Sequence, residues 1–527
     1  MKKFLALTLA LLMLLGVLVA CDSGAETPEG SEAQSSNDTE GSSDVESKSE
    51  ETTKEIVTDK YGQEVLGDLV PYAELDYNGK EFYIISRPED RYKREFGVTT
   101  RQDTVDEKVY MRNEKVNLDL GVKITVVDEM KMWGAGSSSN DANALPNYVL
   151  AMHQAGAPGV DVIASFAAYS TAASLRECYV NLNSDKMTYL HTDKAYWNQS
   201  YIEAASLYDQ LYYIIGDINL GVYDKTIVTF VNNKLLDETE YTLDELQELV
   251  LDMGWTQEVF LKMIRDFGHR DDNESGLQDR GDTFALVAVK LSEQYDGFAA
   301  AFDQILTYKN AQGKFAYNIE GNQNLQDALD ALRDIWSQPG AYAPSGVGPS
   351  FDIFNDSGAL FFTEILYRNA SQYSKMANNP NFTYSILPLP MLDEDQDQYQ
   401  TTPQDAYTIM SVMNCVTDER LEMISAVLDL MASRSYADVR PYYIEQIVKA
   451  RYIDGAASVE IMNMILNGVV FDSGIIYGAQ LSSPCYAVWR NIASGTSSVS
   501  QKWETSGTAC KTKLEDLNGW FLDKSLG

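Results

Sequence analysis

The fold of this chain is decided by EFYIIS at 81–86, TVDEKVYMRNEKVNLDL at 104–120 and VKITVV at 122–127. The two short segments are rich in aromatic and β-branched residues, which favour strands. The long segment predicts a helix, with Asp103 or Thr104 as its N-cap and Gly121 as its stop. A strand, a helix and a second strand in succession are the unit of an α/β fold with a largely parallel sheet.

The same alternation continues along the chain. Helices are predicted at 147–155, at 257–267 before Gly268, and up to Met253 behind a capping box at Thr242 and Glu245. Strands are predicted at 159–164, 211–215, 226–231 and 283–289. The stretch from 61 to 527 is too long for one such sheet, so at least two domains are expected. No internal repeat is present, which argues against a solenoid or a propeller.

The first residues predict export and lipid attachment. Lys2 and Lys3 form a short positive region, and residues 4–19 are an apolar run with the length of a signal-peptide core. The run ends in Leu-Val-Ala before Cys21, which resembles a bacterial lipobox. The resemblance implies a signal peptide at 1–20 and fatty acyl chains such as palmitate on Cys21, the first mature residue. The alternative is an ordinary secretory signal with a chance cysteine.

Residues 21–60 predict a disordered acidic tether. They are rich in Ser, Thr, Glu and Asp, so they cannot bury enough apolar surface to offset the entropy lost on ordering. The chain carries a formal net charge of −37, which argues against nucleic acid as a partner, because phosphate binding needs clusters of Lys and Arg. No second apolar span follows, so the lipid alone is expected to hold the protein at the membrane.

Short motifs in a fixed order resemble the family-1 extracellular solute-binding proteins, the carbohydrate-type lipoproteins that serve ABC transporters. In the first half they are YNGKEF at 77–82, ISR at 85–87, VYMRNEKV at 109–116, GVDVI at 159–163, TFVNNK at 229–234 and GWT at 254–256. In the second half they are GALF at 358–361, LPLP at 387–390, ASRSY at 432–436, PYY at 441–443 and FDSGIIY at 471–477. TFVNNK has an extra Asn and GWT is shortened relative to the family pattern.

The resemblance implies an α/β fold of the type II periplasmic-binding-protein class, with two lobes, an interlobe cleft and a helical C-terminal part. Lobe 1 is expected at 61–217 and 401–455, lobe 2 at 218–400, and the helical part at 456–527, mainly on lobe 2. The implied function is capture of a small solute, a mono- or oligosaccharide, by cleft closure and its delivery to ABC permease subunits. A monomeric binding protein on the extracytoplasmic face of the membrane is expected, and not an enzyme.

Ligand contacts are expected where strands end toward the cleft, because flat aromatic faces and planar polar groups suit a sugar ring and its hydroxyls. The residues at such positions are Arg87, Ser165, Tyr169, Trp197, Asp217, Glu364, Tyr367, Asp405 and Tyr407. The alternative for each is ordinary packing or a solvated loop end.

A calcium site is predicted at 271–282, and no other cofactor is expected. Oxygen-bearing side chains stand at loop positions one, three and five in Asp271, Asn273 and Ser275, and Gly276 follows at position six. Asp282 stands at position twelve, so the spacing is that of an EF-hand loop, in which several oxygens surround a hard cation. Ser275 and Asp282 replace stronger ligands, and the alternative is an acidic surface turn without metal.

Other chemistries find little support in the sequence. His153, His191 and His269 have no metal-ligand spacing and suggest no catalytic triad, and there is no phosphate-binding loop. The cysteines have no CxxC spacing, so buried free thiols are expected, and the alternative is a disulfide formed after export between Cys485 and Cys510. Two alternatives stay open: a secreted glycoside hydrolase with a hidden carboxylate pair, and a surface glycan-adhesion protein without a transporter.

Overall fold

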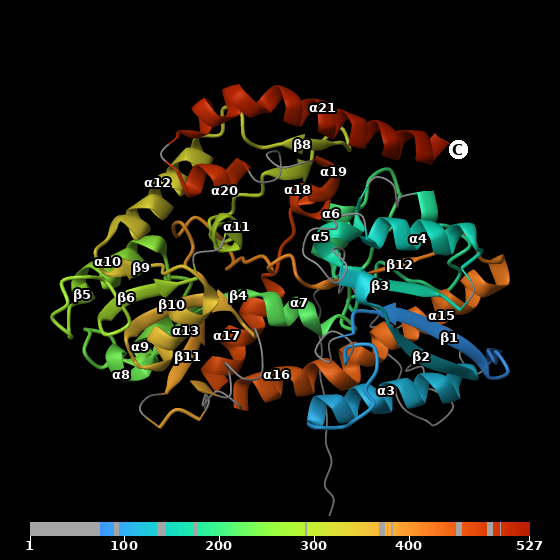
Figure 1. Ribbon diagram of the computed structural model, residues 1–527, viewed down its shortest axis with the longest axis horizontal. Coiled ribbons are helices and arrows are strands. Elements are labelled where there is room, and N and C mark those ends of the chain that lie inside the picture. The colour runs from blue at the N-terminus through green and yellow to red at the C-terminus, as the bar shows by residue number, and fades with distance from the viewer. Residues whose placement is uncertain are drawn as a thin grey trace, which may run out of the picture. The chain divides into compact units, whose positions relative to one another are not determined.

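The computed structural model describes most of the chain after residue 73 (Figure 1). The described residues are 74–88, 94–133, 144–157, 159–172, 177–289, 292–367, 375–376, 378–380, 383–449, 456–481, 488–495 and 497–526. All of them belong to one compact unit, 56–527. The predicted signal peptide, Cys21, the tether and Cys485 lie outside the described residues, so the predictions made for them are not tested by the structure.

The first sheet has the strand order β12-β3-β1-β2. β1 pairs in parallel with both β2 and β3, whereas β12 runs antiparallel to β3. The helices of this half are α3, α4, α5, α6 and α15. The bounds are β1 (Lys80–Ser86), α3 (Thr104–Leu120), β2 (Val122–Asp128), α4 (Ala144–Gln154), β3 (Val162–Phe166), α5 (Ala167–Ser170), α6 (Gln199–Ala205), β12 (Thr408–Val412) and α15 (Asp418–Arg434).

Local sequence explains the ends of α3. The Asp103 carboxylate accepts the N–H of Asp106 at 2.8 Å, which satisfies an otherwise unpaired donor of the first turn. Gly121 ends the helix with φ 61° and donates its N–H to Asn117, and a Cβ there would lie 2.0 Å from Asp76 Oδ1. The predicted helix and its stop are confirmed, and of the two cap candidates Asp103 is the N-cap.

The second sheet has the order β11-β4-β10-β6-β5, with β9 beside β6. Every residue of β4, β6, β10 and β11 is buried, so helices or loops cover both faces. The strand bounds are β4 (Ile227–Asn232), β5 (His269–Arg270), β6 (Thr283–Ala288), β9 (Ala341–Tyr342), β10 (Ala359–Ile365) and β11 (Tyr384–Leu387). The helix bounds are α8 (Asn233–Leu236), α9 (Leu243–Leu251), α10 (Gln257–Phe267), α11 (Ser292–Ala301), α12 (Gln323–Ser337) and α13 (Val347–Asn355).

The expectation of a largely parallel sheet holds for the first sheet, where two of the three pairings are parallel, and is wrong for the second. Among the described strands four pairings are parallel and five are antiparallel. The physical reason lies in the connections, because β4 and β12 are reached directly from segments that cross between the sheets and not through a βαβ crossover. The strand predicted at 211–215 is also absent, since Ile214 makes only a single bridge to Met410.

Segments that cross between the two sheets lie side by side. α7 (Leu220–Lys225) lies between the sheets in Figure 1 and leads into β4. The segment from β11 to β12 runs back, with Pro403 bridged to Thr226, and Val469 bridges to Thr401 on the same segment. These crossings link the two halves, so the site of relative motion is expected here.

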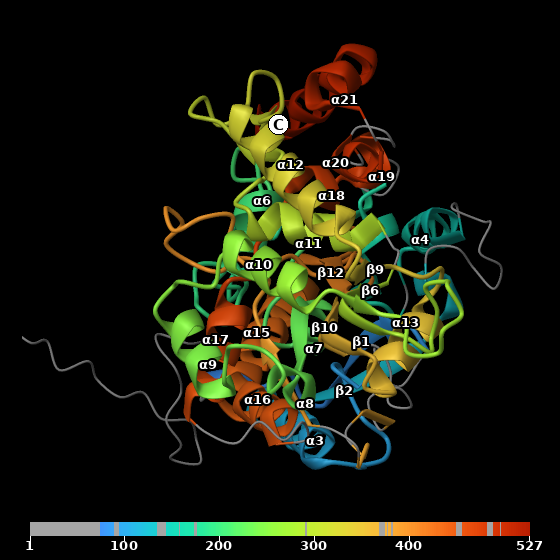
Figure 2. The same cartoon turned by 90° about the vertical axis from the view of Figure 1, so that its left-hand side faces the viewer.

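The C-terminal helices contact both halves. α21 reaches α12 where Val499 N–H donates to Gln326 Oε1 at 3.1 Å, and it reaches the first half where the Trp520 and Tyr212 rings lie 5.1 Å apart. Figures 1 and 2 show α12, α20 and α21 together at one end of this unit. No described helix is long and apolar enough to cross a membrane. The remaining bounds are β7 (Thr307–Lys309), β8 (Phe315–Tyr317), α16 (Arg440–Lys449), α17 (Ala456–Asn467), α18 (Ser473–Ile476), α19 (Gly478–Leu481), α20 (Val488–Ala493) and α21 (Val499–Leu526).

Candidate functional site

Arg87 follows β1 and is fully buried. Its Nη1 donates to Ala406 O at 3.1 Å, its Nη2 donates to Thr408 Oγ1, and its guanidinium carbon lies 5.5 Å from the centre of the Phe166 ring. Arg87 therefore ties the end of β1 to β12 and to the segment that crosses into it. In this arrangement its guanidinium has no access to solvent, so the predicted ligand contact would need the site to open.

Glu95 joins the same buried cluster, although it is not among the residues predicted from the sequence. Its Oε2 accepts the N–H of Gly221 in α7 at 2.9 Å. Burial raises the pKa of Glu95 to about 7, against the lowering effect of Gly221, Thr408 and Arg87. β1, β12 and α7 thus meet at a polar cluster in which one carboxyl titrates near neutral pH. No local motif marks Glu95, because its partners are far away in the sequence.

The residues that follow β3 are partly accessible. Ser165 is buried and its Oγ shares a hydrogen bond with Ser170 Oγ at 2.6 Å. The half-buried Tyr169 ring lies 5.4 Å from the Phe166 ring. Tyr407, which precedes β12, is buried against Phe471 with 5.8 Å between ring centres. Of these predicted residues only Tyr169 offers an aromatic face near solvent.

The residues at the end of β10 lie beside the crossing helix. Glu364 is fully buried, and its Oε1 accepts the N–H of Ile365 at 2.9 Å. Tyr367 is half-buried and donates its backbone N–H to Asp224 O in α7 at 2.8 Å. Asp405 on the other crossing segment is half-buried as well. We call Arg87, Ser165, Tyr169, Glu364, Tyr367, Asp405 and Tyr407 the strand-end group, and Tyr169, Tyr367 and Asp405 are its accessible members.

Trp197 and Asp217 lie in a separate pocket beside α7, with a volume of about 290 Å³. Its lining comes from the segments 195–200 and 215–217, from Val222 and Tyr223 of α7, and from Arg440, Leu466, Asn467 and Val469. We call it the α7 pocket. No sequence signal separates these two residues from the strand-end group, since Arg440 and Asn467 are more than 200 positions away from them.

Asp429 of α15 fixes the wall of this pocket. Its fully buried carboxylate accepts His191 N–H at 3.0 Å and Trp197 Nε1–H at 3.3 Å on Oδ1. On Oδ2 it accepts the Tyr196 hydroxyl at 2.9 Å and bonds with His191 Nδ1 at 2.9 Å. The hydrogen bond to Asp429 is the main cause of a raised pKa at His191. Four partners on one carboxylate hold the Trp197 indole in place, and Trp197 is only 1% exposed.

Asp217→Asn is expected to stabilise the protein near pH 7.5. Burial raises the pKa of Asp217 from 3.8 to about 6, against the lowering effects of Arg440 and Tyr223. The contribution of Asp217 to the free energy of unfolding is therefore fully present below pH 3.8 and is lost as the pH rises through about 6. The total loss is about 3 kcal/mol. Urea unfolding should show the variant more stable by about 1 to 3 kcal/mol near pH 7.5 and the gain shrinking toward pH 4.5. Asp185→Asn at an exposed position is the control, and an equal gain at both pH values would contradict the expectation.

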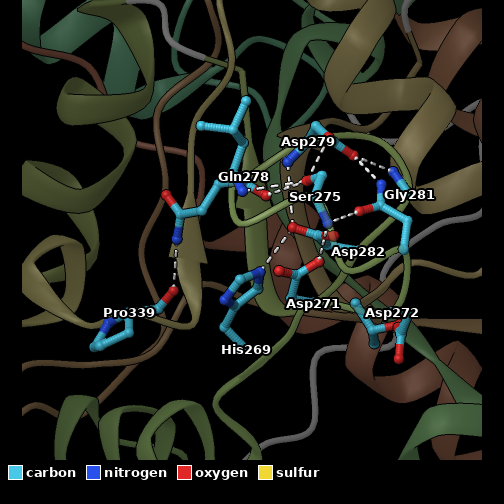
Figure 3. Close-up of polar contacts among 12 residues, drawn as sticks. His269, Asp271, Asp272, Ser275, Gln278, Asp279, Gly281, Asp282 and Pro339 are labelled. Atoms are coloured by element: carbon cyan, nitrogen blue, oxygen red, sulfur yellow. Dashed lines mark hydrogen bonds and ion pairs between the residues drawn. The ribbon is translucent and has the colours of Figure 1, made fainter.

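The acidic loop at 271–282 is closed by its own hydrogen bonds, and Figure 3 shows Asp271, Ser275 and Asp279 pointing toward one another. Asp271 accepts the N–H groups of Ser275 and Gly276 at 3.0 and 2.8 Å. Asn273 turns its amide nitrogen, not its oxygen, toward Asp279 Oδ1 at 2.7 Å. The side chains and backbone of the loop thus satisfy one another in this arrangement.

The donor set does not fit a calcium ion in this arrangement. Asp282 is buried, and its Oδ2 bonds with His269 Nε2 at 2.8 Å and accepts the N–H of Asp279 at 3.3 Å (Figure 3). Among the described residues no group of three or more His, Cys, Asp or Glu side chains could hold a metal ion. The calcium site stays a prediction, and binding there would require Asn273 to turn and Asp282 to leave His269.

We expect millimolar calcium to leave the melting temperature unchanged. Asp271→Ala should lower it by a few degrees, because two backbone N–H groups lose their acceptor. Differential scanning calorimetry of both proteins with calcium and with a chelator measures both effects. A calcium-dependent rise that Asp271→Ala removes would support the calcium site instead of the self-contained turn.

Two sheets joined by crossing segments, with helices at the C-terminal end, are the fold of the two-lobed solute-binding proteins. The sugar-binding protein MalE from the phytopathogen Xanthomonas citri aligns at 13% identity and a TM-score of 0.52, over 84% of this chain and 98% of MalE. A cyclo/maltodextrin-binding protein complexed with maltotetraose aligns at 10% identity and a TM-score of 0.50, over 83% of this chain and 97% of that protein. No family model matches the sequence, and no curated protein is similar to it.

The chain therefore has the type II solute-binding fold, as expected from the sequence. It spans nearly the full length of both structures, so no lobe of that fold is missing. Ligands of α/β proteins bind beyond the carboxyl ends of their parallel strands. In this chain the strand-end group lies at such ends, where β1, β3 and β10 meet the crossing segments.

Proposed function

We propose that this protein is an extracytoplasmic solute-binding protein that captures a carbohydrate between its two lobes. The observation that carries the proposal is the two-lobed fold shared along 98% of a sugar-binding MalE. Tyr169 on one lobe and Tyr367 on the other supply aromatic faces for a sugar ring, and Asp405 supplies a carboxylate for its hydroxyls. A ligand that contacts both lobes favours the closed state, because only that state makes both sets of contacts.

Binding without turnover is the expected behaviour. The fold neighbours are binding proteins, and a binding protein releases its ligand unchanged. A thermal-shift screen of mono- and oligosaccharides, maltotetraose included, should raise the melting temperature in a saturable way. Chromatography of the same mixtures should find no new reducing ends after long incubation. Release of reducing sugar would favour the glycoside hydrolase alternative, and affinity for polymers alone would favour a glycan-adhesion protein.

Tyr169→Ala and Tyr367→Ala test the site itself. Each should weaken the binding of the responding sugar by about tenfold or more, because each loses an aromatic face worth about 1.5 kcal/mol. Tyr308→Ala, at a residue 42% exposed on β7, is the matched control and should bind as the parent protein does. Equal affinity in all three variants would place the sugar elsewhere.

We further propose that acyl chains on Cys21 anchor the protein to the membrane, and that it delivers its solute to the permease of an ABC importer. The support is the lipobox at 18–21 and the acidic segment behind it. Cys21→Ser should leave the protein out of the membrane fraction and release it into the medium or periplasm. Membrane association unchanged by Cys21→Ser would contradict lipid attachment while leaving sugar binding untouched.

A further inference from the structure

The α7 pocket shares no residue with the strand-end group. It lies where the segment 195–200, helix α7 and the helices α16 and α17 come together, and its volume is about 290 Å³. That volume is at the lower limit of small-molecule pockets, which run from about 300 to 1,000 Å³. A site of this size would take one small ring and not an oligosaccharide.

Polar groups in the pocket have unused hydrogen-bonding capacity. Asp217 is 4% exposed, its Oδ1 accepts the Tyr223 hydroxyl, and its Oδ2 takes part in no hydrogen bond among the described residues. Arg440 Nε is buried without a hydrogen bond and lies 3.6 Å from Asp217 Oδ1, while its Nη2 donates to Asn467 Oδ1 at 3.2 Å. The buried Arg440 Nε is ion-paired with Asp217 but makes no hydrogen bond, and such a donor is costly unless a water or a ligand completes it.

The charge of the lining selects the class of ligand. Asp217 and Arg440 are opposite charges within 3.6 Å, so together they favour neither an anion nor a cation. A carboxylate accepts hydroxyl hydrogens and a guanidinium donates to hydroxyl oxygens, so the pair suits a ligand with neighbouring hydroxyl groups. Ile215, Val222 and Leu466 add apolar surface that suits the carbon face of a ring.

We propose that the α7 pocket is a second binding site, for a single neutral polyhydroxylated ring of monosaccharide size. Asp217 accepts hydroxyls through Oδ2, and Arg440 donates through Nε. Trp197 forms the floor and not a stacking platform, because Asp429 holds its indole and Gly216 covers it, with the position of a Cβ on Gly216 lying 2.6 Å from the ring. The site is independent of the strand-end group, so it does not rest on the proposed sugar transport.

The probe is 2-deoxy-2-fluoro-D-glucose, observed by fluorine NMR with the mature chain. Ser200→Trp fills the pocket and should abolish one bound signal. Asn467→Leu keeps the branched shape of the side chain but removes the acceptor that orients Arg440, and it should weaken that signal roughly tenfold. Glu203→Trp lies on the same helix α6 as Ser200, carries a side chain that is 70% exposed, and should leave the signal unchanged.

The two sites can be told apart by their variants. Loss of a probe signal in Tyr169→Ala or Tyr367→Ala alone reports on the strand-end group, whereas loss in Ser200→Trp and Asn467→Leu alone reports on the α7 pocket. Circular dichroism must show that each variant is folded. The proposal is overturned if the parent chain binds no probe up to the solubility of the sugar, or if folded Ser200→Trp and Asn467→Leu keep every bound signal.

Discussion

Asp429→Ala is expected to destabilise the protein by about 3 to 5 kcal/mol. Asp429 is fully buried and bonds with His191, Tyr196 and Trp197. The substitution removes the acceptor of the buried Tyr196 hydroxyl and Trp197 indole N–H, and it removes a charge-assisted partner from His191. It also releases the wall of the α7 pocket, so local order should fall there first.

Urea unfolding followed by circular dichroism measures this loss, with Glu419→Ala at an exposed position of α15 as the control. The pKa of His191 is raised above 6.5, first by its hydrogen bond to Asp429. The stabilisation that the protonated His191 gains from Asp429 is fully present below pH 6.5. It is lost as the pH rises through the pKa that His191 has in the folded protein. The destabilisation by Asp429→Ala should therefore be larger near pH 6 than near pH 8.5. A loss below about 1 kcal/mol at both pH values would contradict the network.

Arg420→Ala is expected to destabilise the protein by a similar amount, about 3 to 5 kcal/mol. Arg420 holds Asp161 through two bonds of 2.6 Å and donates to Glu81 O at 2.6 Å. The Asp161 side chain is only 1% exposed, and its other partner is the Tyr83 N–H at 2.7 Å. Without Arg420 a buried carboxylate keeps a single hydrogen bond, and α15 loses its attachment to β1 and β3.

A double-mutant cycle with Asp161→Asn separates the ion pair from the rest of this effect. The double variant should recover part of the stability that Arg420→Ala loses, because no unpaired charge then remains buried. Lys186→Ala is the matched control, since it breaks an ion pair with Asp418 in the first turn of α15 that is more than half exposed on both sides. Its effect should stay below about 1 kcal/mol. Equal effects of Arg420→Ala and Lys186→Ala would show that the buried pair has no special role.

Local chemistry made much of the secondary structure predictable. The helix Thr104–Leu120 and the helix Gln257–Phe267 have the bounds predicted from their caps and glycines, and the capping box of Thr242 and Glu245 is formed. These signals act within one turn of chain, so a sequence displays them directly. The direction of a strand in a sheet depends on its pairing partner, which can lie far away in the sequence. The antiparallel pairings of β4 and β12 were therefore not predicted.

The candidate site was predictable in part, for the same physical reason. Strand ends pointed to Arg87 and Tyr367, and the structure places both beside the crossing segments. Burial could not be inferred, because Arg87 is enclosed by Ala406 and Thr408, which lie more than 300 positions later. Glu95 has no local signature either. It stands in a loop of the sequence where a glutamate is unremarkable, and it is buried because α7 packs against it.

The most direct test of the account is small-angle X-ray scattering of the mature chain with and without a saturating carbohydrate identified in the thermal-shift screen. Two lobes that close around a solute should give a smaller radius of gyration with the sugar, reversed when the sugar is dialysed away. The Tyr367→Ala variant should show the smaller radius only at a higher sugar concentration. A radius of gyration that is unchanged at full saturation, or sugar that returns from dialysis cleaved, would contradict capture by lobe closure.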